Sequence, residues 1–137
     1  MITFLPYPDF MRSAKVLDNQ RLGKQRVEAV QVVRIILAKD SKFKYHPLTI
    51  MWNPFLHALC NYGMVVCEEW SDRGFVDHLW HEFYNAKQNV PLIRPTWIGD
   101  NLLHSSHRSN LLRKNYSHYQ KFGWTESIGL DYYWPKP

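Results

Sequence analysis

The sequence contains no apolar run that approaches the roughly 20 residues needed to span a membrane. It also has only two cysteines, Cys60 and Cys67, which lie seven residues apart in a stretch with helical periodicity. Two helical turns separate Cα atoms by more than a disulfide permits, so we expect both to be small core residues. The first residues lack the basic region of a signal peptide, and we expect a cytoplasmic protein with no membrane partner.

The histidines do not follow a metal-binding pattern. The pairs His78/His81 and His104/His107 have His-x-x-His spacing, but no Cys-x-x-Cys or carboxylate–histidine motif accompanies them. We therefore predict no metal site and no small-molecule cofactor.

Runs of alternating polar and apolar residues are missing as well, and so are internal repeats, low-complexity segments and linkers. At 137 residues the chain is long enough for one hydrophobic core and too short for two ordinary domains. These features predict an all-α protein with a single domain over residues 1–137, built from about four helices. An extended arm precedes the helices, and an irregular aromatic tail follows them.

Positive charge and aromatic side chains are what the sequence has in excess. The formal net charge is +5, and 15% of the residues are aromatic. Basic side chains neutralise phosphates and aromatic rings stack on bases, so this combination favours a nucleic-acid partner.

Residues 16–38 predict a long amphipathic helix with an unusual polar face. Arg21, Lys24, Glu28 and Gln31 follow one another at steps of three and four residues, so they line one side. From the residues alone, Glu28 is either a solvated ion-pair partner of Lys24 or a carboxylate that acts in catalysis at the edge of burial. The apolar stripe opposite comprises Leu22, Ala29, Val30, Val33, Ile36 and Leu37.

Three further helices follow from capping residues and apolar spacing. Asn53-Pro54 predicts a helix start and Gly74 a stop, which gives a helix over about 53–71. A helix over about 76–88 has Val76 and Phe83 directed inward, and Asp100 caps one that ends near residue 114. We expect one more turn from about residue 117 to 122, and an arm over residues 1–9 anchored by Thr3-Phe4-Leu5.

Three short segments resemble a known family, the pyrimidine dimer DNA glycosylases of the phage endonuclease V type. In that family a Gln–basic–Leu step precedes the catalytic glutamate by the interval that separates Gln20-Arg21-Leu22 from Glu28. The His46-Pro47 step before Met51-Trp52, and the segment 107–119, resemble bacterial members. The resemblance therefore spans most of the chain.

The resemblance implies a compact helical fold in which the amine of the chain's first residue attacks C1′ of a nucleotide, displaces the damaged base and forms an imine. Glu28 would stabilise the cationic intermediate and assist strand cleavage as an abasic-site lyase. A free α-amino group is partly neutral near neutral pH, which suits this role. The bulky Ile2 disfavours removal of Met1, so the nucleophile would be the amine of Met1.

The same resemblance assigns DNA contacts. The partner would be duplex DNA that contains a lesion, bound by a monomer. Gln20 and Arg21 take the positions beside the lesion, and Lys24 shares the face of Glu28. The complete set of predicted DNA contacts is Thr3, Gln20, Arg21, Lys24, Arg108, Arg113, Lys114 and Lys121.

Two other functions stay open on the sequence. One is a binding module without catalysis on the same fold, with Glu28 as a surface ion-pair partner. The other is a glycosylase for a modified base that is not a dimer. For His107 and His118 we expect surface or capping roles, and for the cluster Tyr132-Tyr133-Trp134 a lid over the core, with base stacking as the alternative.

Overall fold

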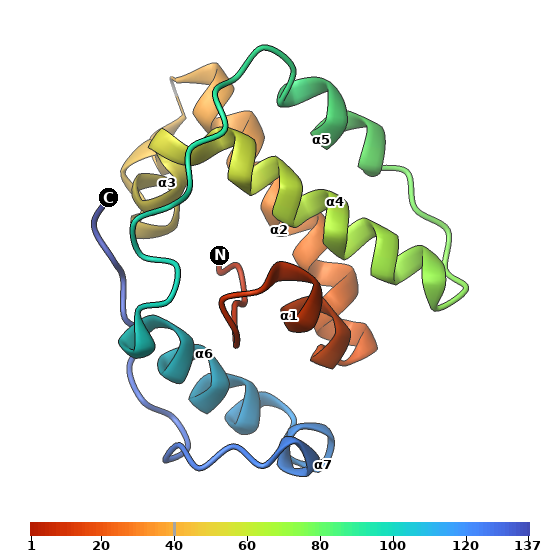
Figure 1. Ribbon diagram of the computed structural model, residues 1–137, viewed down its shortest axis with the longest axis vertical. Helices are drawn as coiled ribbons and strands as arrows, with labels where there is room; N and C mark the ends of the chain where they lie inside the picture. The colour runs from red at the N-terminus through yellow and green to blue at the C-terminus, as the bar shows by residue number, and fades with distance from the viewer. Residues whose placement is uncertain (40) are drawn as a thin grey trace.

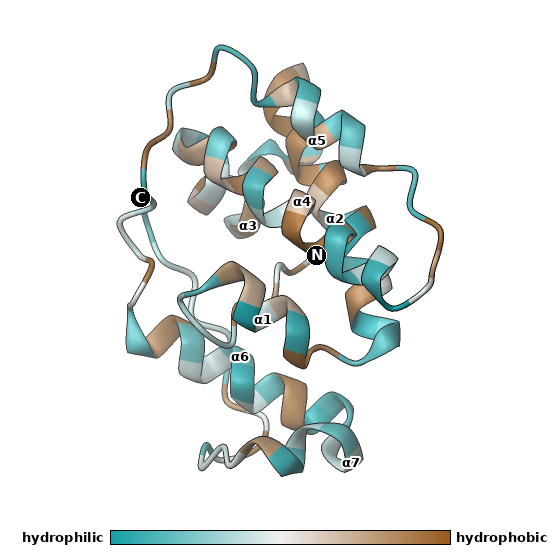
Figure 2. Cartoon of the chain, turned by 45° about the vertical axis from the view of Figure 1, so that its right-hand side comes forward, coloured by the Kyte–Doolittle hydropathy of each residue, from teal (hydrophilic) through white to brown (hydrophobic). Residues whose placement is uncertain are grey.

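Two long helices, α2 (Asn19–Ala38) and α4 (Leu56–Asp72), pack against each other at the centre of the computed structural model (Figure 1). The structure describes residues 1–39 and 41–137, and within these ranges it is all-helical without strands, as predicted. Hydrophobic residues concentrate where α2 and α4 meet (Figure 2). Most of the predicted stripe on α2 is buried, but Leu37, in the last turn, is 54% exposed.

A cap on α1 and a hydrogen-bonded turn set the start of α2. Asp9 caps the short helix α1 (Phe10–Val16) by accepting a backbone N–H through its side chain. The chain then turns at Leu17 and Asp18, whose backbones are extended, and α2 begins. The Asp18 N–H donates to the Tyr119 hydroxyl, which in turn donates to the Asp18 carboxylate, so the C-terminal part of the chain fixes this turn.

The connection from α2 to α4 differs from the prediction. The 3₁₀ turn η1 (Lys42–Tyr45) leads into a helix that we did not predict, α3 (Pro47–Trp52). Asn53 does not cap α4, because its backbone is helical at the end of α3, where its N–H donates to the Thr49 carbonyl, whereas an N-cap residue has a non-helical backbone. The 3₁₀ turn η2 (Asn53–Phe55) follows, and α4 begins only at Leu56.

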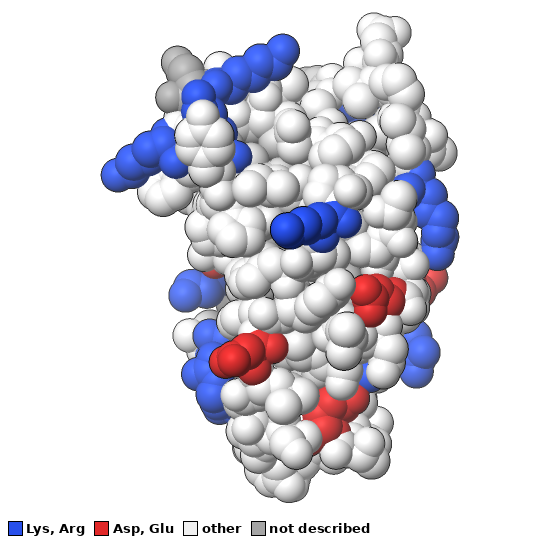
Figure 3. Space-filling view, turned by 90° about the vertical axis from the view of Figure 1, so that its left-hand side faces the viewer, with Lys and Arg blue, Asp and Glu red and all other residues white. Residues whose placement is uncertain are grey.

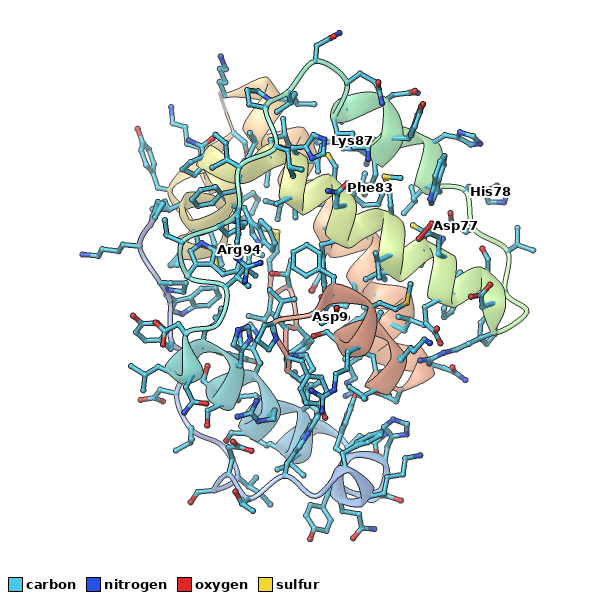
Figure 4. The ribbon with its side chains drawn as sticks, in the orientation of Figure 1. Asp9, Asp77, His78, Phe83, Lys87 and Arg94 are labelled. Atoms are coloured by element: carbon cyan, nitrogen blue, oxygen red, sulfur yellow. The ribbon has the colours of Figure 1, made fainter. Side chains whose placement is uncertain are left out.

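Helix α5 (Trp80–Ala86) is shorter than the predicted range of 76–88. Asp77 accepts the N–H of Trp80 at 3.0 Å and so starts the helix later, which leaves Val76 73% exposed instead of inward. Phe83 packs so closely on α4 that a Cβ placed on Gly63 would lie 2.3 Å from its ring. Figure 4 shows Phe83 directed from α5 toward α4.

The last third of the chain forms α6 (Asn101–Lys114), α7 (Tyr116–Tyr119) and the turn η3 (Gln120–Phe122). Asp100 caps α6, as predicted. The tail then runs back along α6, and the C-terminus comes near α3 (Figure 1). Ser109 and Asn110 hold the backbone of Leu130 at 2.8 and 2.7 Å, so the predicted packing of the tail over the core is confirmed.

The predicted core roles of Cys60 and Cys67 are confirmed, since both are buried and unbridged. Among the helices of residues 1–39 and 41–137, none combines the length and apolar character that crossing a membrane requires.

Candidate active site

The first five residues form an extended segment that helices α3 and α6 hold by hydrogen bonds. The Thr3 hydroxyl accepts from Trp52 Nε1 at 2.9 Å. Leu5 is bound on both sides, because its N–H donates to His107 Nδ1 at 2.9 Å and its carbonyl accepts from His104 Nδ1 at 2.7 Å. Buried backbone groups paired in this way fix the register of the arm, and with it the position of the chain's first residue.

The two histidines are held neutral in opposite tautomers. His104 donates from Nδ1 and accepts the Gly99 N–H on Nε2 at 3.0 Å. His107 accepts on Nδ1, so its proton is on Nε2, which is buried without a partner in the described structure. Burial, with a contribution from His104, lowers the pKa of His107 to about 3. The predicted surface or capping role of His107 is therefore wrong: it is a buried acceptor for the arm.

Gln25 joins the arm to the catalytic candidate. Its Oε1 accepts the Phe4 N–H at 2.8 Å and lies 2.8 Å from the Tyr62 hydroxyl. Its Nε2 lies 3.2 Å from both the Ile2 carbonyl and the Glu28 carboxylate. Because Phe4 requires an acceptor and Ile2 a donor, only this orientation of the amide satisfies all partners.

Glu28 lies beside the beginning of the chain. Its Oε2 accepts the Ile2 N–H at 3.4 Å as well as the amide of Gln25, so the carboxylate is directed toward the arm. Burial lowers the pKa of His46, and the positive charge of the N-terminal amine lowers it further, so the amine lies near this ring as well. The His46 ring packs edge-to-face on Trp134 at 5.7 Å. The amine of Met1 is thus near both a carboxylate and an imidazole.

Lys114 on α6 lies near three other cations, Arg113 on α6 and Arg21 and Lys24 on α2, and near Glu28; we call these four cationic residues the cation group. Burial lowers the pKa of Lys114, the charges of Arg113, Arg21 and Lys24 lower it further, and the charge of Glu28 opposes them. These groups are therefore close enough to influence one another, although the residues come from opposite parts of the sequence. Arg21 also pairs with Asp18 at 3.2 Å, so the cation group faces two carboxylates and keeps an excess of positive charge. Such an excess suits a site that binds an anionic substrate, and the carboxylate of Glu28 can stabilise a developing positive charge.

The other predicted DNA contacts differ in how they are placed. Gln20 is exposed at the start of α2, where its side chain accepts from Arg21 at 3.2 Å. Arg108 instead points inward, with its side chain 16% exposed, and binds Glu126 and the Pro6 carbonyl, both at 2.8 Å. It therefore ties the tail to the arm.

Two of the predicted contacts lie apart from the cation group. Thr3 is fully buried and bonded to Trp52, so a DNA contact does not fit the structure and we leave it out of the proposed interface. Lys121 lies on η3, with its ammonium 5.4 Å from the centre of the Phe122 ring.

Sequence reasoning missed Gln25, His46 and His104. The spacing held a signal for Gln25, because it falls three residues after Leu22 and four before Ala29, on the apolar stripe of α2. A polar residue at a core position needs a buried partner. For His104 the signal is weaker, since its partner in the arm is the backbone carbonyl of Leu5, 99 positions away. His46 caps α3 by accepting the Leu48 N–H, which explains its place before Pro47 without reference to the arm.

A cavity of about 680 Å³ lies away from Glu28. It lies between α1, α4 and the segment before α6, with Asp9, Asn61 and Arg94 as its polar lining and Phe10 among the apolar residues. Asp9 and Arg94 flank this region in Figure 4. No lining residue belongs to the cation group, so the arrangement of charges, and not cavity size, indicates the candidate active site.

A protein-family model described as pyrimidine dimer DNA glycosylase matches residues 1–83. The matched range contains the arm, α2 with Glu28, and α3, whose Trp52 donates a hydrogen bond to Thr3. No curated protein and no solved structure matches the chain.

Proposed function

The chain belongs to the pyrimidine dimer DNA glycosylase family, and we propose that it excises a damaged base from duplex DNA, a pyrimidine dimer first of all, and then cleaves the strand as an abasic-site lyase. The observation that carries this proposal is the 3.4 Å contact between Glu28 Oε2 and the Ile2 N–H. It places one carboxylate next to the first peptide unit of the chain.

The proposed chemistry uses the amine of Met1 as the nucleophile. The neutral amine donates its lone pair to C1′ of the damaged nucleotide, the bond from C1′ to the base breaks, and the bonding electrons leave with the base, which takes up a proton. The sugar ring opens to a protonated imine. Removal of a proton from C2′ then expels the 3′ phosphate and cleaves the strand.

Glu28 has two roles in this scheme. Its negative charge stabilises the cationic imine, and its carboxylate accepts the proton that must leave for strand cleavage. The amide of Gln25 keeps the carboxylate directed toward the arm, at 3.2 Å. Gln25 is a positioning residue, because it contacts the arm and Glu28 and not the reacting atoms.

The cations around Glu28 are proposed to bind phosphates on both sides of the lesion. Arg21 and Lys24 on α2 and Arg113 and Lys114 on α6 would neutralise the DNA backbone and release its counterions. A flipped nucleotide would bring C1′ within reach of the amine.

Trapping of the imine tests the mechanism. We would incubate the untagged protein with a duplex that contains one abasic site and add borohydride, which reduces an imine to a stable adduct. The proposal requires an adduct on the first residue of the chain, identified by the mass of the peptide, and its loss when the N-terminus is acetylated. DNA binding without an adduct would refute the amine mechanism and favour a binding module.

Substitution of Glu28→Gln tests the carboxylate. It keeps the shape of the side chain and removes its charge, so we expect strand cleavage on a dimer-containing duplex to fall by about 10²–10⁴-fold. Glu68→Gln, at an exposed position of α4, is the matched control and should keep full activity. A duplex with a modified base that is not a dimer, tested beside it, separates the two glycosylase activities.

A further inference from the structure

A second, smaller pocket lies at the end of α2, next to the turn η1. Its volume is about 210 Å³, and its lining includes Ile35, Lys39, Lys44, Tyr45 and Thr49. The residues come from α2, η1 and α3, so the pocket depends on the fold of the whole connection and not on one flexible segment.

Thr49 gives this pocket an unused hydrogen-bonding group. Its side chain is 3% exposed, and within the described ranges its Oγ1 is buried without a hydrogen-bond partner. A buried hydroxyl normally finds a partner, because desolvation without a hydrogen bond is unfavourable. A ligand in the pocket would supply one when the side chain rotates about its Cα–Cβ bond and turns the hydroxyl toward the pocket.

The other polar groups of the pocket are suited to an anion. Lys39 and Lys44 both line it, and in the part of the chain that the structure describes neither forms an ion pair. Tyr45 is 74% exposed, and the ammonium of Lys44 lies 5.1 Å from the centre of its ring. Figure 3 shows Lys and Arg side chains gathered at the upper left of one face of the molecule.

The pocket lies on the same side of α2 as the candidate catalytic carboxylate. Ile35 follows Glu28 by seven residues, and seven steps of about 100° differ from two full turns by only about 20°. Lys39 follows Glu28 by eleven residues, or about 16 Å along the helix axis. DNA rises 3.4 Å for each base pair, so this distance corresponds to about five base pairs.

We propose that this pocket binds a backbone phosphate of the DNA substrate about five base pairs from the nucleotide attacked beside Glu28. The inference rests on the proposed function and extends it to a second anchoring point. The ammonium groups of Lys39 and Lys44 neutralise the phosphate, and the Thr49 hydroxyl donates a hydrogen bond to one of its oxygens. Duplexes that do not reach the pocket lose this contact.

Binding to duplexes of two lengths tests the proposal. We would use the Glu28→Gln protein, so that the DNA is not consumed, and measure fluorescence anisotropy with duplexes of 8 and 24 base pairs centred on an abasic-site analogue. Lys44→Gln should weaken binding of the long duplex about three- to tenfold and reduce the salt slope by about one. Thr49→Val keeps the side-chain shape and should weaken binding of the long duplex without changing the salt slope.

The short duplex and a distant lysine provide the controls. Neither substitution should affect the 8-base-pair duplex, and Lys15→Gln, on α1, should leave both duplexes unaffected. The proposal would be overturned if the substitutions weakened binding of both duplexes equally. It would also be overturned if neither substitution changed binding of the long duplex. Absence of binding to either duplex, by contrast, would refute the proposed function itself.

A free anion is the other possible source of phosphate. We would titrate the protein with inorganic phosphate and follow the Thr49 methyl group by NMR. Saturation with phosphate that Lys44→Gln abolishes, together with unchanged long-duplex binding, would overturn the assignment to DNA. If phosphate competes with the long duplex but not with the short one, the assignment to DNA is supported.

Discussion

Acidification is expected to destabilise this protein through His107. The imidazole accepts the Leu5 N–H in a fully buried position, and its pKa in the folded protein is about 3. In the unfolded chain a histidine has a pKa near 6.5. Between these values the unfolded state binds more protons, so the stability contribution is present above about pH 6.5 and is lost as the pH falls.

The magnitude follows from the two pKa values. Between pH 7 and pH 5 the protonation of His107 in the unfolded chain should lower the free energy of unfolding by about 2 kcal/mol. Any folded-state pKa below about 4.5 gives nearly the same loss over this interval, because the folded imidazole stays neutral throughout. Further acidification to pH 3 should bring the total to about 4 kcal/mol.

Urea denaturation at pH 7 and pH 5 measures this effect when the protein is compared with the variant His107→Asn. An asparagine oxygen can replace Nδ1 as the acceptor for Leu5 and does not titrate. The variant is less stable at both pH values because it leaves a cavity, but its loss between them should be about 2 kcal/mol smaller. An identical pH dependence in both proteins would refute the reasoning, since other groups contribute equally to both.

Two substitutions in α2 and α4 give further tests. Gln25→Leu retains the volume but leaves the partners of the amide unpaired, so the free energy of unfolding should fall by about 2–4 kcal/mol and strand cleavage by more than tenfold. Gln88→Leu, at an exposed position after α5, is the control and should change neither by much; equal effects of the two variants in urea and cleavage assays would contradict the positioning role. Gly63→Ala places a Cβ 2.3 Å from the buried ring of Phe83, and despite the better helix propensity of alanine we expect a loss of about 2 kcal/mol in urea. A raised denaturation midpoint would show that the ring can move away.

Much of the helical architecture could be predicted because it depends on local signals. Apolar spacing located α2, α4 and α6, and Asp100 marked the start of α6 correctly. The errors arose where tertiary contacts determine the boundaries. Asn53 has the sequence of an N-cap, but α3 uses its N–H. Asp77 caps α5 through its side chain and excludes Val76 from the helix, which periodicity alone does not reveal.

The candidate active site could be predicted only in part. Glu28 and its cationic neighbours on α2 follow from spacing within one helix. The resemblance added Arg113 from α6, and the excess of basic residues in this part of the sequence added Lys114. The buried partners of the arm could not be found in this way. Leu5 and His107 are separated by 102 positions, and a single hydrogen bond from the Leu5 N–H joins them. Any residue except proline has this N–H, so the sequence of the arm gives no sign of the contact.

These buried contacts have a consequence for a mechanism that uses the first residue of a chain. A chain terminus is normally the least ordered part of a protein, and catalysis requires the nucleophile in a defined position. Apolar packing alone would allow the arm to slide along its groove, because hydrophobic contacts are not directional. The hydrogen bonds from Gln25, His104 and His107 act on consecutive residues, so a shift of one residue would leave buried donors and acceptors unpaired. Polar residues at core positions facing an N-terminal arm are therefore as informative about an amine nucleophile as the carboxylate itself.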